Sequence, residues 1–307
     1  MGHHGHDHAA EARNGNRRAL AVVLALTASF TVVEIIGGLL TGSLALLADA
    51  GHMLSDNFSL GVALFAAWLA GRPATPDKSF GYRRAEILAA LANGMTLVAI
   101  SVWVFAEAYA RLREPTEVLG GPMLAVATLG LLVNAASAAI LYRFAGESLN
   151  VEGALRHVFA DALGSVGAMV AAATIILTGW RYADPLISVA IGLLILGSSW
   201  KLLRDSTNIL LEATPRGLNA GEVGRRMAAA QGVVEVHDLH IWTITSGFPA
   251  LSAHVLVGKH EDCHARRREL EELLTNEYGI SHTTLQVDHV DDHHTTLHTL
   301  RFPSRLD

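Results

Sequence analysis

The sequence predicts a polytopic α-helical membrane protein, with six transmembrane helices followed by a C-terminal cytoplasmic α+β domain. Composition is the first observation: hydrophobic residues make up 51% of the 307 residues, charged residues only 17%, and mean hydropathy is +0.34. Such values are typical of a membrane protein. The second observation is the distribution of charge. Residues 20–212 carry 25 charged side chains, whereas the 95 residues 213–307 carry 22. The chain therefore divides into a membrane region and a soluble region.

Composition also excludes two other classes of protein. The formal net charge is −6 and no basic run is long enough to follow a phosphate backbone, which excludes a nucleic-acid partner. The single cysteine, Cys263, cannot form a disulfide within the chain. Its thiol either lies at a helix start without a further role or binds a metal beside His264.

Six apolar runs are long enough to cross a bilayer, which takes about 20 helical residues. They cover residues 19–40, 44–70, 87–110, 122–142, 157–179 and 184–203. Many Gly, Ala and Ser residues lie within them, as in GVALFAAWLAG, and small residues let helix backbones approach each other in lipid. A compact helical bundle in the lipid bilayer is predicted.

Lysine and arginine are unevenly divided between the two sets of loops. If the N-terminus is cytoplasmic, the inner segments hold eleven of these residues and the outer loops hold three, Arg111, Arg113 and Arg181. Basic residues favour the cytoplasmic side of a membrane. Both termini are therefore predicted to be cytoplasmic.

After residue 212 the pattern changes to that of a small soluble domain. Helices are predicted at residues 218–231 and 263–278, and strands at 233–244, 249–257 and 282–290. The order α-β-β-α-β suits a sheet with helices on one face, as in ferredoxin-like domains. We expect a His-rich cytoplasmic tail (1–18), a transmembrane domain (19–212), a metal-binding cytoplasmic domain (213–290) and a C-terminal tail (291–307).

Sixteen histidines are present, but only His52 and His157 lie between residues 9 and 236. Each is followed four residues later by an aspartate, Asp56 or Asp161, and residues four apart share one face of a helix. Two imidazole nitrogens and two carboxylate oxygens suit a tetrahedral Zn²⁺ site. An aspartate at the bilayer centre costs about 2.5 to 3.5 kcal/mol, so a cation partner is expected. The alternative is that each pair forms a local hydrogen bond or a protein contact.

Four segments carry a resemblance to a known family. They are GSLALLADAGHMLSD at 42–56, SFGYRRAEILAALANG at 79–94, HDLHIW at 237–242 and SAHV at 252–255. With the six spans and the two His-x-x-x-Asp pairs, they make the chain resemble the cation diffusion facilitator family, especially its bacterial zinc exporters. The resemblance covers nearly the whole chain, from Arg17 to Asp288.

The resemblance implies a secondary active transporter that exports zinc from the cytoplasm in exchange for protons. Alternating access would operate around a tetrahedral site between the second and fifth transmembrane helices. The ligands at this transport site would be His52, Asp56, His157 and Asp161. Zn²⁺ is the first choice, with Cd²⁺ and Co²⁺ as alternatives, because ligand type alone discriminates poorly between these metals. A homodimer in the inner membrane of the cell is also implied.

A second, cytoplasmic Zn²⁺ site is implied by the same resemblance at His237, His254, His282 and Asp288. Gln286 stands where some relatives have a histidine, which leaves the number of ligands open. Odd spacing along a strand predicts that His237 and His240 face opposite sides, so that only His237 joins the site. The alternative is that these residues are polar positions on a solvated sheet face.

Two interpretations are open for each of several other polar residues. The histidines of HHGHDH, which are His3, His4, His6 and His8, and those of HVDDHHTTLH at 289–298 either capture metal or belong to flexible tails. Glu34 is either a packing acid or part of a cavity lining, and Asp49 lies near the helix face of His52. The resemblance also implies a charge pair between Arg83 or Arg84 and Glu212.

An enzyme and a sensor are the alternatives to a transporter. A metallohydrolase needs an open water position and a general base, typically within His-Glu-x-x-His, which this sequence lacks, so an enzyme is not expected. A membrane-bound metal sensor that signals through its cytoplasmic domain fits the C-terminal histidines. A sensor of this kind gives no role to the two His-x-x-x-Asp pairs in the predicted transmembrane helices.

Overall fold

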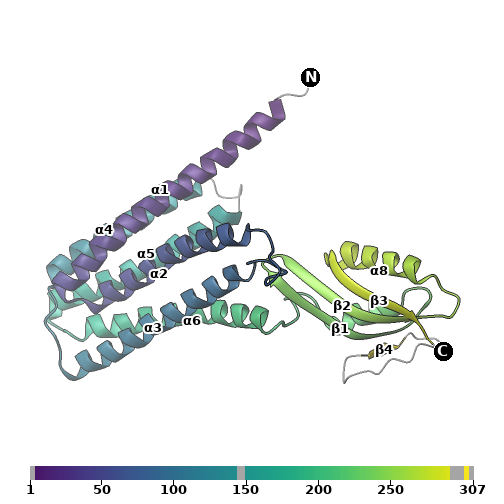
Figure 1. Cartoon of the computed structure of the whole chain (residues 1–307). Coiled ribbons are helices and arrows are strands. Elements are labelled where there is room, and N and C mark those ends of the chain that lie inside the picture. The colour runs from purple at the N-terminus through teal and green to yellow at the C-terminus, as the bar shows by residue number, and fades with distance from the viewer. Residues whose placement is uncertain (1–3, 144–148, 291–300, 304–307) are drawn as a thin grey trace. The chain divides into compact units, whose positions relative to one another are not determined.

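The computed structural model describes residues 4–143, 149–290 and 301–303, and these residues belong to two compact units (Figure 1). One unit consists of the residues up to Ala63 together with Ala92–Leu203. The other consists of Leu64–Leu91 and the residues from Arg204 onward. Residues 64–91 thus pack with the C-terminal part of the chain. Sequence periodicity has no means of predicting this grouping, because it reports local structure only.

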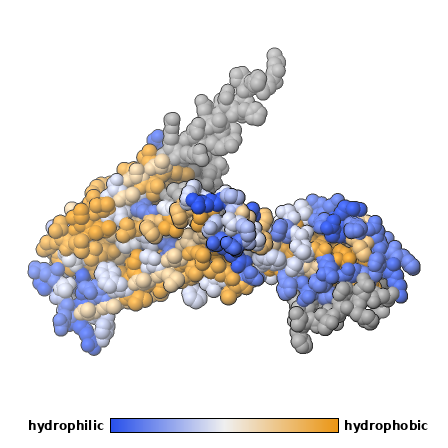
Figure 2. Space-filling model, in the orientation of Figure 1, coloured by the Kyte–Doolittle hydropathy of each residue, from blue (hydrophilic) through white to orange (hydrophobic). Residues whose placement is uncertain are grey.

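Six long helices carry the apolar part of the described sequence (Figure 1). They are α1 (His4–Thr41), α2 (Leu44–Ala70), α3 (Ala85–Arg113), α4 (Gly120–Tyr142), α5 (Leu149–Thr178) and α6 (Ala183–Leu210). Among the described residues, α1 from Ala19, α3, α4, α5 from Ala154 and α6 are long and apolar enough to cross a membrane. Figure 2 shows hydrophobic residues gathered over the helices and hydrophilic ones over the C-terminal domain. The protein is a multi-pass membrane protein, as predicted.

Several helices extend beyond the apolar runs of the sequence. α1 begins at His4 rather than near residue 19, α5 begins at Leu149 rather than 157, and α6 ends at Leu210 rather than 203. Hydropathy marks only the stretch that suits lipid, whereas backbone hydrogen bonding continues into the polar flanks. The segment predicted as a tail is helical from His4. The side chains of His4, His6 and His8, and the whole of His3, lie outside the described residues.

Glycines allow close contacts between helices of the bundle. A Cβ atom on Gly130 of α4 would lie 2.7 Å from Phe30 of α1, and one on Gly94 of α3 would lie 2.8 Å from Leu203 of α6. These separations are shorter than a Cβ atom tolerates, so both positions suit glycine. Lipid gives helices no hydrophobic drive to associate, and close van der Waals packing of this kind holds a bundle together.

The C-terminal domain contains two helices and a four-stranded sheet. Its elements are α7 (Ala220–Ala228), β1 (Val233–Thr245), β2 (Phe248–Val257), α8 (Cys263–Tyr278), β3 (His282–His289) and β4 (Arg301–Pro303). The strand order is β3-β2-β1-β4, in which β1 pairs antiparallel with β2 and β4, and β2 pairs parallel with β3. A parallel pair needs a crossover connection, which α8 provides. The predicted fold class, a membrane domain of six helices of which five are long and apolar enough to span within the described residues, followed by an α+β domain, is confirmed.

β4 is an addition to the predicted elements. It lies within residues 291–307, and its three residues are too few to produce an alternating pattern. The histidines at 293, 294 and 298, which belong to the second His-rich segment, lie outside the described residues.

The two faces of the sheet differ. α7 and α8 pack buried residues such as Met227 and Leu274 against one face, and Val255 of β2 and Leu285 of β3 belong to this core. Because side chains alternate along a strand, His254 next to Val255 lies on the opposite face. His237, which follows Val236 of the same core, lies on that face as well.

Candidate metal centre

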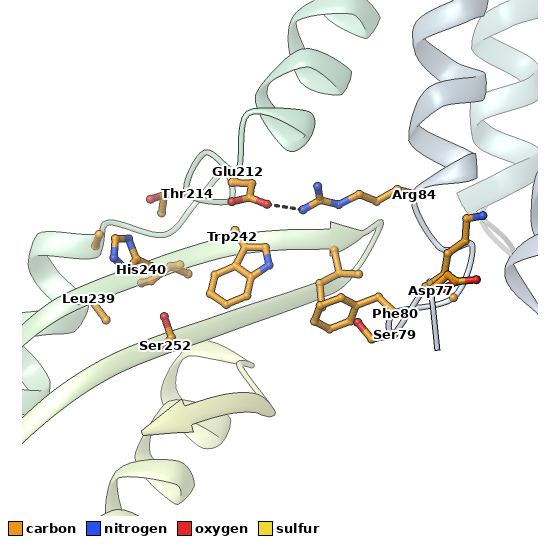
Figure 3. Close-up of a pocket in the computed structure, with 15 residues that line it drawn as sticks. Asp77, Ser79, Phe80, Arg84, Glu212, Thr214, Leu239, His240, Trp242 and Ser252 are labelled. Atoms are coloured by element: carbon orange, nitrogen blue, oxygen red, sulfur yellow. Dashed lines mark hydrogen bonds and ion pairs between the residues drawn. The ribbon is translucent and has the colours of Figure 1, made fainter. Parts of the chain in front are cut away.

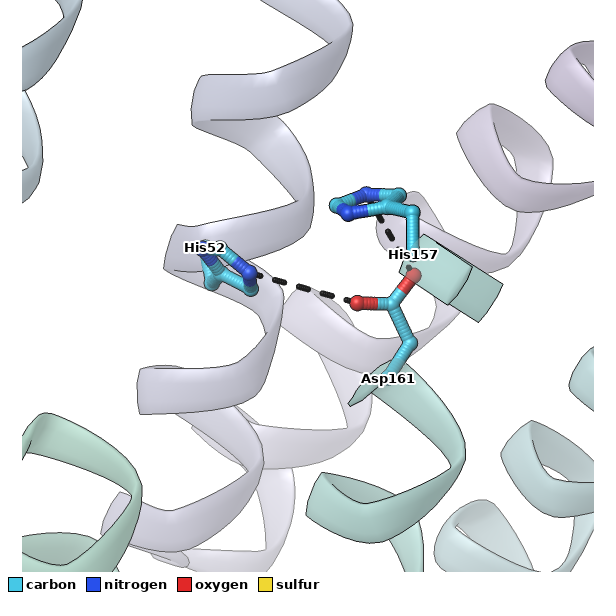
Figure 4. A group of neighbouring side chains, drawn as sticks. All are labelled: His52, His157 and Asp161. Carbon is cyan, nitrogen blue, oxygen red and sulfur yellow. Dashed lines mark ion pairs between the residues drawn. The ribbon is translucent and has the colours of Figure 1, made fainter. Parts of the chain in front are cut away.

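α2 and α5 bring the two His-x-x-x-Asp pairs together. His157 Nε2 lies 3.2 Å from Asp56 Oδ2 and 3.6 Å from Asp161 Oδ2. His52 Nε2 lies 3.4 Å from Asp56 Oδ2 and 4.0 Å from Asp161 Oδ1. Figure 4 shows His52, His157 and Asp161 turned toward one another. The i,i+4 spacing aligns each pair on its own helix, and the packing of α2 against α5 joins the two pairs.

These four side chains suit a divalent cation. Ligand atoms about 3.3 Å apart surround a tetrahedral zinc ion with bonds of about 2.0 Å, and the four separations between a histidine and an aspartate run from 3.2 to 4.0 Å. Ligand atoms of His52, His157 and Asp161 all lie within 4.8 Å of one another. Asp161 is 2% exposed, and neither its Oδ1 nor Asp56 Oδ2 accepts a hydrogen bond from the residues that the structure describes. A buried carboxylate in this state is stabilised by a cation, either a metal ion or a proton.

A cavity of about 560 Å³ reaches this group from one side. Asp56, His157 and Asp161 line it, together with polar Thr27 of α1 and Asn57 of α2. The rest of the lining consists of Leu20, Ala21, Val23, Leu24, Met53, Ala154 and Val158. The His157 side chain is 44% exposed, so an ion that enters the cavity meets His157 before the buried Asp161.

Two further acids are buried in the same unit. Asp49 of α2 is 2% exposed and Glu34 of α1 is fully buried. A Cβ atom on Gly164 of α5 would lie 2.5 Å from Asp49 Oδ1. Gly164 follows Asp161 by three residues, so Asp49 packs against α5 about one turn from Asp161. The absence of a side chain at Gly164 lets this carboxylate approach α5.

Comparison with known families covers both parts of the chain. Residues 20–211 match the cation efflux transmembrane domain, and residues 215–290 match the cytoplasmic domain of cation efflux proteins. The chain belongs to the cation diffusion facilitator family. The resemblance carried by the sequence motifs is thereby confirmed. Members of this family are metal transporters and not enzymes.

Relatives within the family match nearly the whole chain. The metal cation efflux system protein CzcD of Cupriavidus metallidurans is 42% identical over 93% of this chain and 89% of its own. The cadmium, cobalt and zinc/H(+)-K(+) antiporter of Bacillus subtilis is 42% identical over 92% of both chains. The zinc transporter ZitB of Escherichia coli is 42% identical over 96% of this chain and 95% of its own. Among solved structures, the metal-bound C-terminal domain of the CzcD transporter is 34% identical, covers 23% of this chain and 97% of its own, and has a TM-score of 0.22.

The C-terminal domain holds a second group of polar residues, on the sheet face opposite α7 and α8. His237 of β1 pairs in register with His254 of β2, which pairs with Gln286 of β3. The rings of His237 and His254 are 5.5 Å apart between centroids, and Gln286 Nε2 donates to Asp288 Oδ2 at 2.8 Å. Two imidazoles and one carboxylate thus form a row across three strands. We call His237, His254, Gln286 and Asp288 the histidine row.

His282 does not lie in the histidine row. It pairs in register with Ala250, and it precedes Gln286 by four residues, about 13 Å along β3. Its ring lies 5.5 Å from that of Phe248 and 6.1 Å from that of Phe80. Of the other three predicted residues, His237 and His254 lie side by side, and Asp288 lies two residues along β3 from Gln286, the partner of His254. Strand register separates His282 from them, and motif spacing alone does not report register.

The prediction that His237 and His240 face opposite sides of β1 is wrong. A bulge interrupts β1 between them, where Asp238 has a φ of 53°. The extra residue places His240 opposite Ser252, on the same face as His237. Burial distinguishes the two histidines, because the His240 side chain is 62% exposed and the His237 side chain 2%.

A larger cavity of about 890 Å³ lies beside β1 in the unit that contains the C-terminal domain (Figure 3). His240 and Trp242 line it from β1, and Arg84 and Glu212 line it from the segments before α3 and after α6. Arg84 Nη2 lies 2.9 Å from Glu212 Oε1, which is the charge pair that the resemblance implies. Its lining residues do not include His237 or His254, so this cavity is separate from the histidine row.

Cys263, the first residue of α8, contacts His289. Its Sγ atom lies 3.8 Å from Nδ1 and 3.7 Å from Nε2 of His289. His289 Nε2 also lies 3.1 Å from the Glu261 carbonyl oxygen. The parallel crossover returns the end of β3 to the start of α8, and adjacency in the sequence gives no signal of this contact.

Proposed function

We propose that this protein is a secondary active transporter that exports zinc from the cytoplasm in exchange for protons. One observation carries the proposal: four side chains from α2 and α5 lie close together between these helices. They are those of His52, Asp56, His157 and Asp161. Two imidazole nitrogens and two carboxylate oxygens make a tetrahedral donor set for Zn²⁺. The names of the zinc transporter and of the cadmium, cobalt and zinc antiporter support this class of cargo, with Cd²⁺ and Co²⁺ as further candidates.

Proton exchange follows from the chemistry of these ligands. Zn²⁺ binding needs neutral imidazoles and ionised carboxylates, so binding releases protons and a fall in pH weakens binding. Histidine titrates near neutral pH, within the working range of a cell. Protons that enter the site displace the metal and then neutralise carboxylates that would be costly to leave charged in the membrane.

Alternating access requires the site to open to each side of the membrane in turn. The ligands come in two pairs from two helices, so a movement of α2 against α5 changes the coordination of the ion. The cavity at Asp56 and His157 offers one of the two routes. We infer that ion release follows the separation of the two pairs.

We further propose that the C-terminal domain binds Zn²⁺ through His237, His254 and Asp288. Two nitrogens and one carboxylate, with water in the fourth position, are a sufficient donor set. His282 remains a predicted ligand on the resemblance alone, because its ring contacts Phe80 and Phe248. A homodimer is proposed because residues 215–290 match the domain designated ZT_dimer.

The proposed location is the inner membrane of the cell, with both termini in the cytoplasm. The uneven distribution of lysine and arginine supports this orientation. The match of residues 215–290 to the cytoplasmic domain of cation efflux proteins supports it as well.

Proton flux in sealed vesicles tests the transport proposal. The purified full chain is reconstituted into vesicles that hold a pH-sensitive dye, and Zn²⁺ is then added. Wild type is expected to move protons only when Zn²⁺ is present. Asp161→Ala is expected to lose this flux, because the site then lacks its most buried carboxylate. Glu152→Gln removes an acid from an exposed position of the same helix, and this control is expected to keep the flux.

Two outcomes would contradict the proposal. Zn²⁺-driven flux that survives in Asp161→Ala would place the transport path elsewhere. Zinc binding by wild type without any flux would favour a membrane-bound metal sensor that signals through its C-terminal domain.

A further inference from the structure

A buried carboxylate outside the transport site holds the start of α2. Asp184, the second residue of α6, is fully buried. Its Oδ1 accepts hydrogen bonds from the Ser43 hydroxyl at 2.6 Å and from the Ala45 N–H at 3.2 Å. Its Oδ2 accepts one from the Leu44 N–H at 2.8 Å. A side chain of α6 therefore caps a helix that begins 140 residues earlier in the chain.

Every N–H group in the first turn of α2 finds an acceptor at this corner. Leu44 and Ala45 donate to Asp184, and Leu46 donates to Ser43 Oγ at 3.2 Å. The Ser43 N–H, the fourth donor, donates to Thr41 Oγ1 at 3.3 Å. A helix start leaves four such donors without partners inside the helix, and a neighbouring residue in the sequence usually caps it. In α2, two of the four depend on another helix. The start of α2 is thereby fixed to the start of α6.

Arg111, near the end of α3, joins the same corner. Its Nη1 lies 3.6 Å from Asp184 Oδ2 and donates to the Gly42 carbonyl at 2.5 Å, while its Nε donates to Glu107 Oε1 at 2.9 Å. Gly42 turns the chain from α1 into α2 with a φ of 70°. The arginine thus balances the charge of the buried carboxylate and holds the turn that precedes α2.

α2 carries half of the transport site. His52 and Asp56 follow Leu44 by eight and twelve residues, which is about 12 and 18 Å along a helix. A helix transmits a rotation or a shift at its start to side chains at this distance. The contacts between these ligands and α5 span only 3.2 to 4.0 Å, so the ligands tolerate little displacement.

We propose that Asp184 is a positioning residue for metal transport. By capping α2 it sets the rotation and axial position of that helix, and so the placement of His52 and Asp56 against His157 and Asp161. The inference rests on the function proposed for that site.

The KM of Zn²⁺-driven proton flux, compared at equal amounts of folded protein in vesicles, tests the inference. For Asp184→Ala we expect KM to rise about tenfold, the lower end of the effect of residues that orient metal ligands. Asp184→Asn keeps one carbonyl oxygen as an acceptor, so its KM should rise less. Thr174→Ala, which removes a hydroxyl-to-backbone hydrogen bond at a half-buried position of α5, is the control and should leave KM unchanged.

Ser43→Ala provides a second test that does not alter the buried charge. It removes one donor to Asp184 and the acceptor of Leu46, so its KM should also rise. If Asp184→Ala does not fold, Asp184→Asn and Ser43→Ala decide the question. A merely structural role predicts less folded protein and a lower Tm, with unchanged KM per folded molecule, and that result would overturn the inference.

Failure of the proposed function gives a different result from failure of this inference. If the protein does not transport zinc, wild-type vesicles show no Zn²⁺-driven flux at all. If only the positioning role is wrong, wild type transports and the Asp184 and Ser43 variants share its KM.

Discussion

The four ligands of the proposed transport site differ in burial and in chemistry. Asp161 is almost fully buried, whereas His157, one helical turn earlier, is 44% exposed toward the cavity. His52 and Asp56 are intermediate, with 17% and 26% of their side chains exposed. The exposed imidazole is placed to receive an ion, and the buried carboxylate depends on a cation for its stability.

Exchange of one nitrogen ligand for oxygen should change the preference for metal. His52→Asp replaces an imidazole with a carboxylate, which can bind through one oxygen or two and so accepts a larger ion. We expect the ratio of Cd²⁺ to Zn²⁺ transport to rise several-fold, because metals differ in their preference for nitrogen and oxygen. The measurement is proton flux driven by each metal in reconstituted vesicles. His240→Asp, at an exposed site on β1, is the control, and an equal ratio in both variants would show that His52 does not select the metal.

The close approach of α2 and α5 depends on a glycine. A Cβ atom on Gly164 would lie 2.5 Å from Asp49 Oδ1, whereas one on Gly197 of α6 would meet no atom within 4 Å. We expect Gly164→Ala to lower the free energy of unfolding by about 1 to 3 kcal/mol, as overpacking does, and to reduce Zn²⁺-driven flux. Gly197→Ala should keep or raise stability, because alanine favours a helix over glycine by about 1 kcal/mol. Thermal unfolding of the two purified variants makes the comparison, and equal Tm values would contradict it.

The start of α8 should respond to acid. Asp262 accepts hydrogen bonds from the N–H groups of Ala265 and His264, at 3.2 and 2.9 Å, and these bonds hold its pKa below the usual value of 3.8. A carboxyl with a lowered pKa stabilises the folded state above its unfolded pKa, and this contribution is lost as pH falls through the folded pKa. We expect amide hydrogen exchange in the first turn of α8 to be slower in wild type than in Asp262→Ala near neutral pH. That difference should shrink below about pH 4, and a difference that stayed constant into strong acid would assign the stabilisation to another group.

Zinc should stabilise the whole protein through the histidine row. A ligand that binds only the folded state at a hundred times its Kd adds about 2.7 kcal/mol of stability. We expect added Zn²⁺ to raise the Tm of the full chain, and His237→Ala to lose part of that rise. His240→Ala removes a histidine from the same strand and the same face at an exposed position, so it should keep the full rise. Equal rises in Tm for the two variants, measured with Zn²⁺ and with a chelator, would exclude His237 as a ligand.

Segments that are distant in the sequence contact each other at several places in this protein. Arg84 and Glu212 pair across 128 residues of sequence, and Cys263 meets His289 at the end of the parallel crossover. Residues 64–91, which include the end of α2 and the start of α3, group with the C-terminal part of the chain. Each of these contacts arises from topology, so a change in one segment is expected to act on residues far away in the sequence.

The sequence by itself determined the membrane fold class, the alignment of each histidine with its aspartate, and the family. Hydropathy fixes which segments suit lipid, and helix periodicity fixes which side chains share a face, so both are local properties. Only the tertiary structure decided that Asp184 caps α2, that a bulge at Asp238 turns His240 to the face of His237, and that His282 lies away from the histidine row. These outcomes depend on packing and strand register, which sum many small interactions between segments that are distant in the chain.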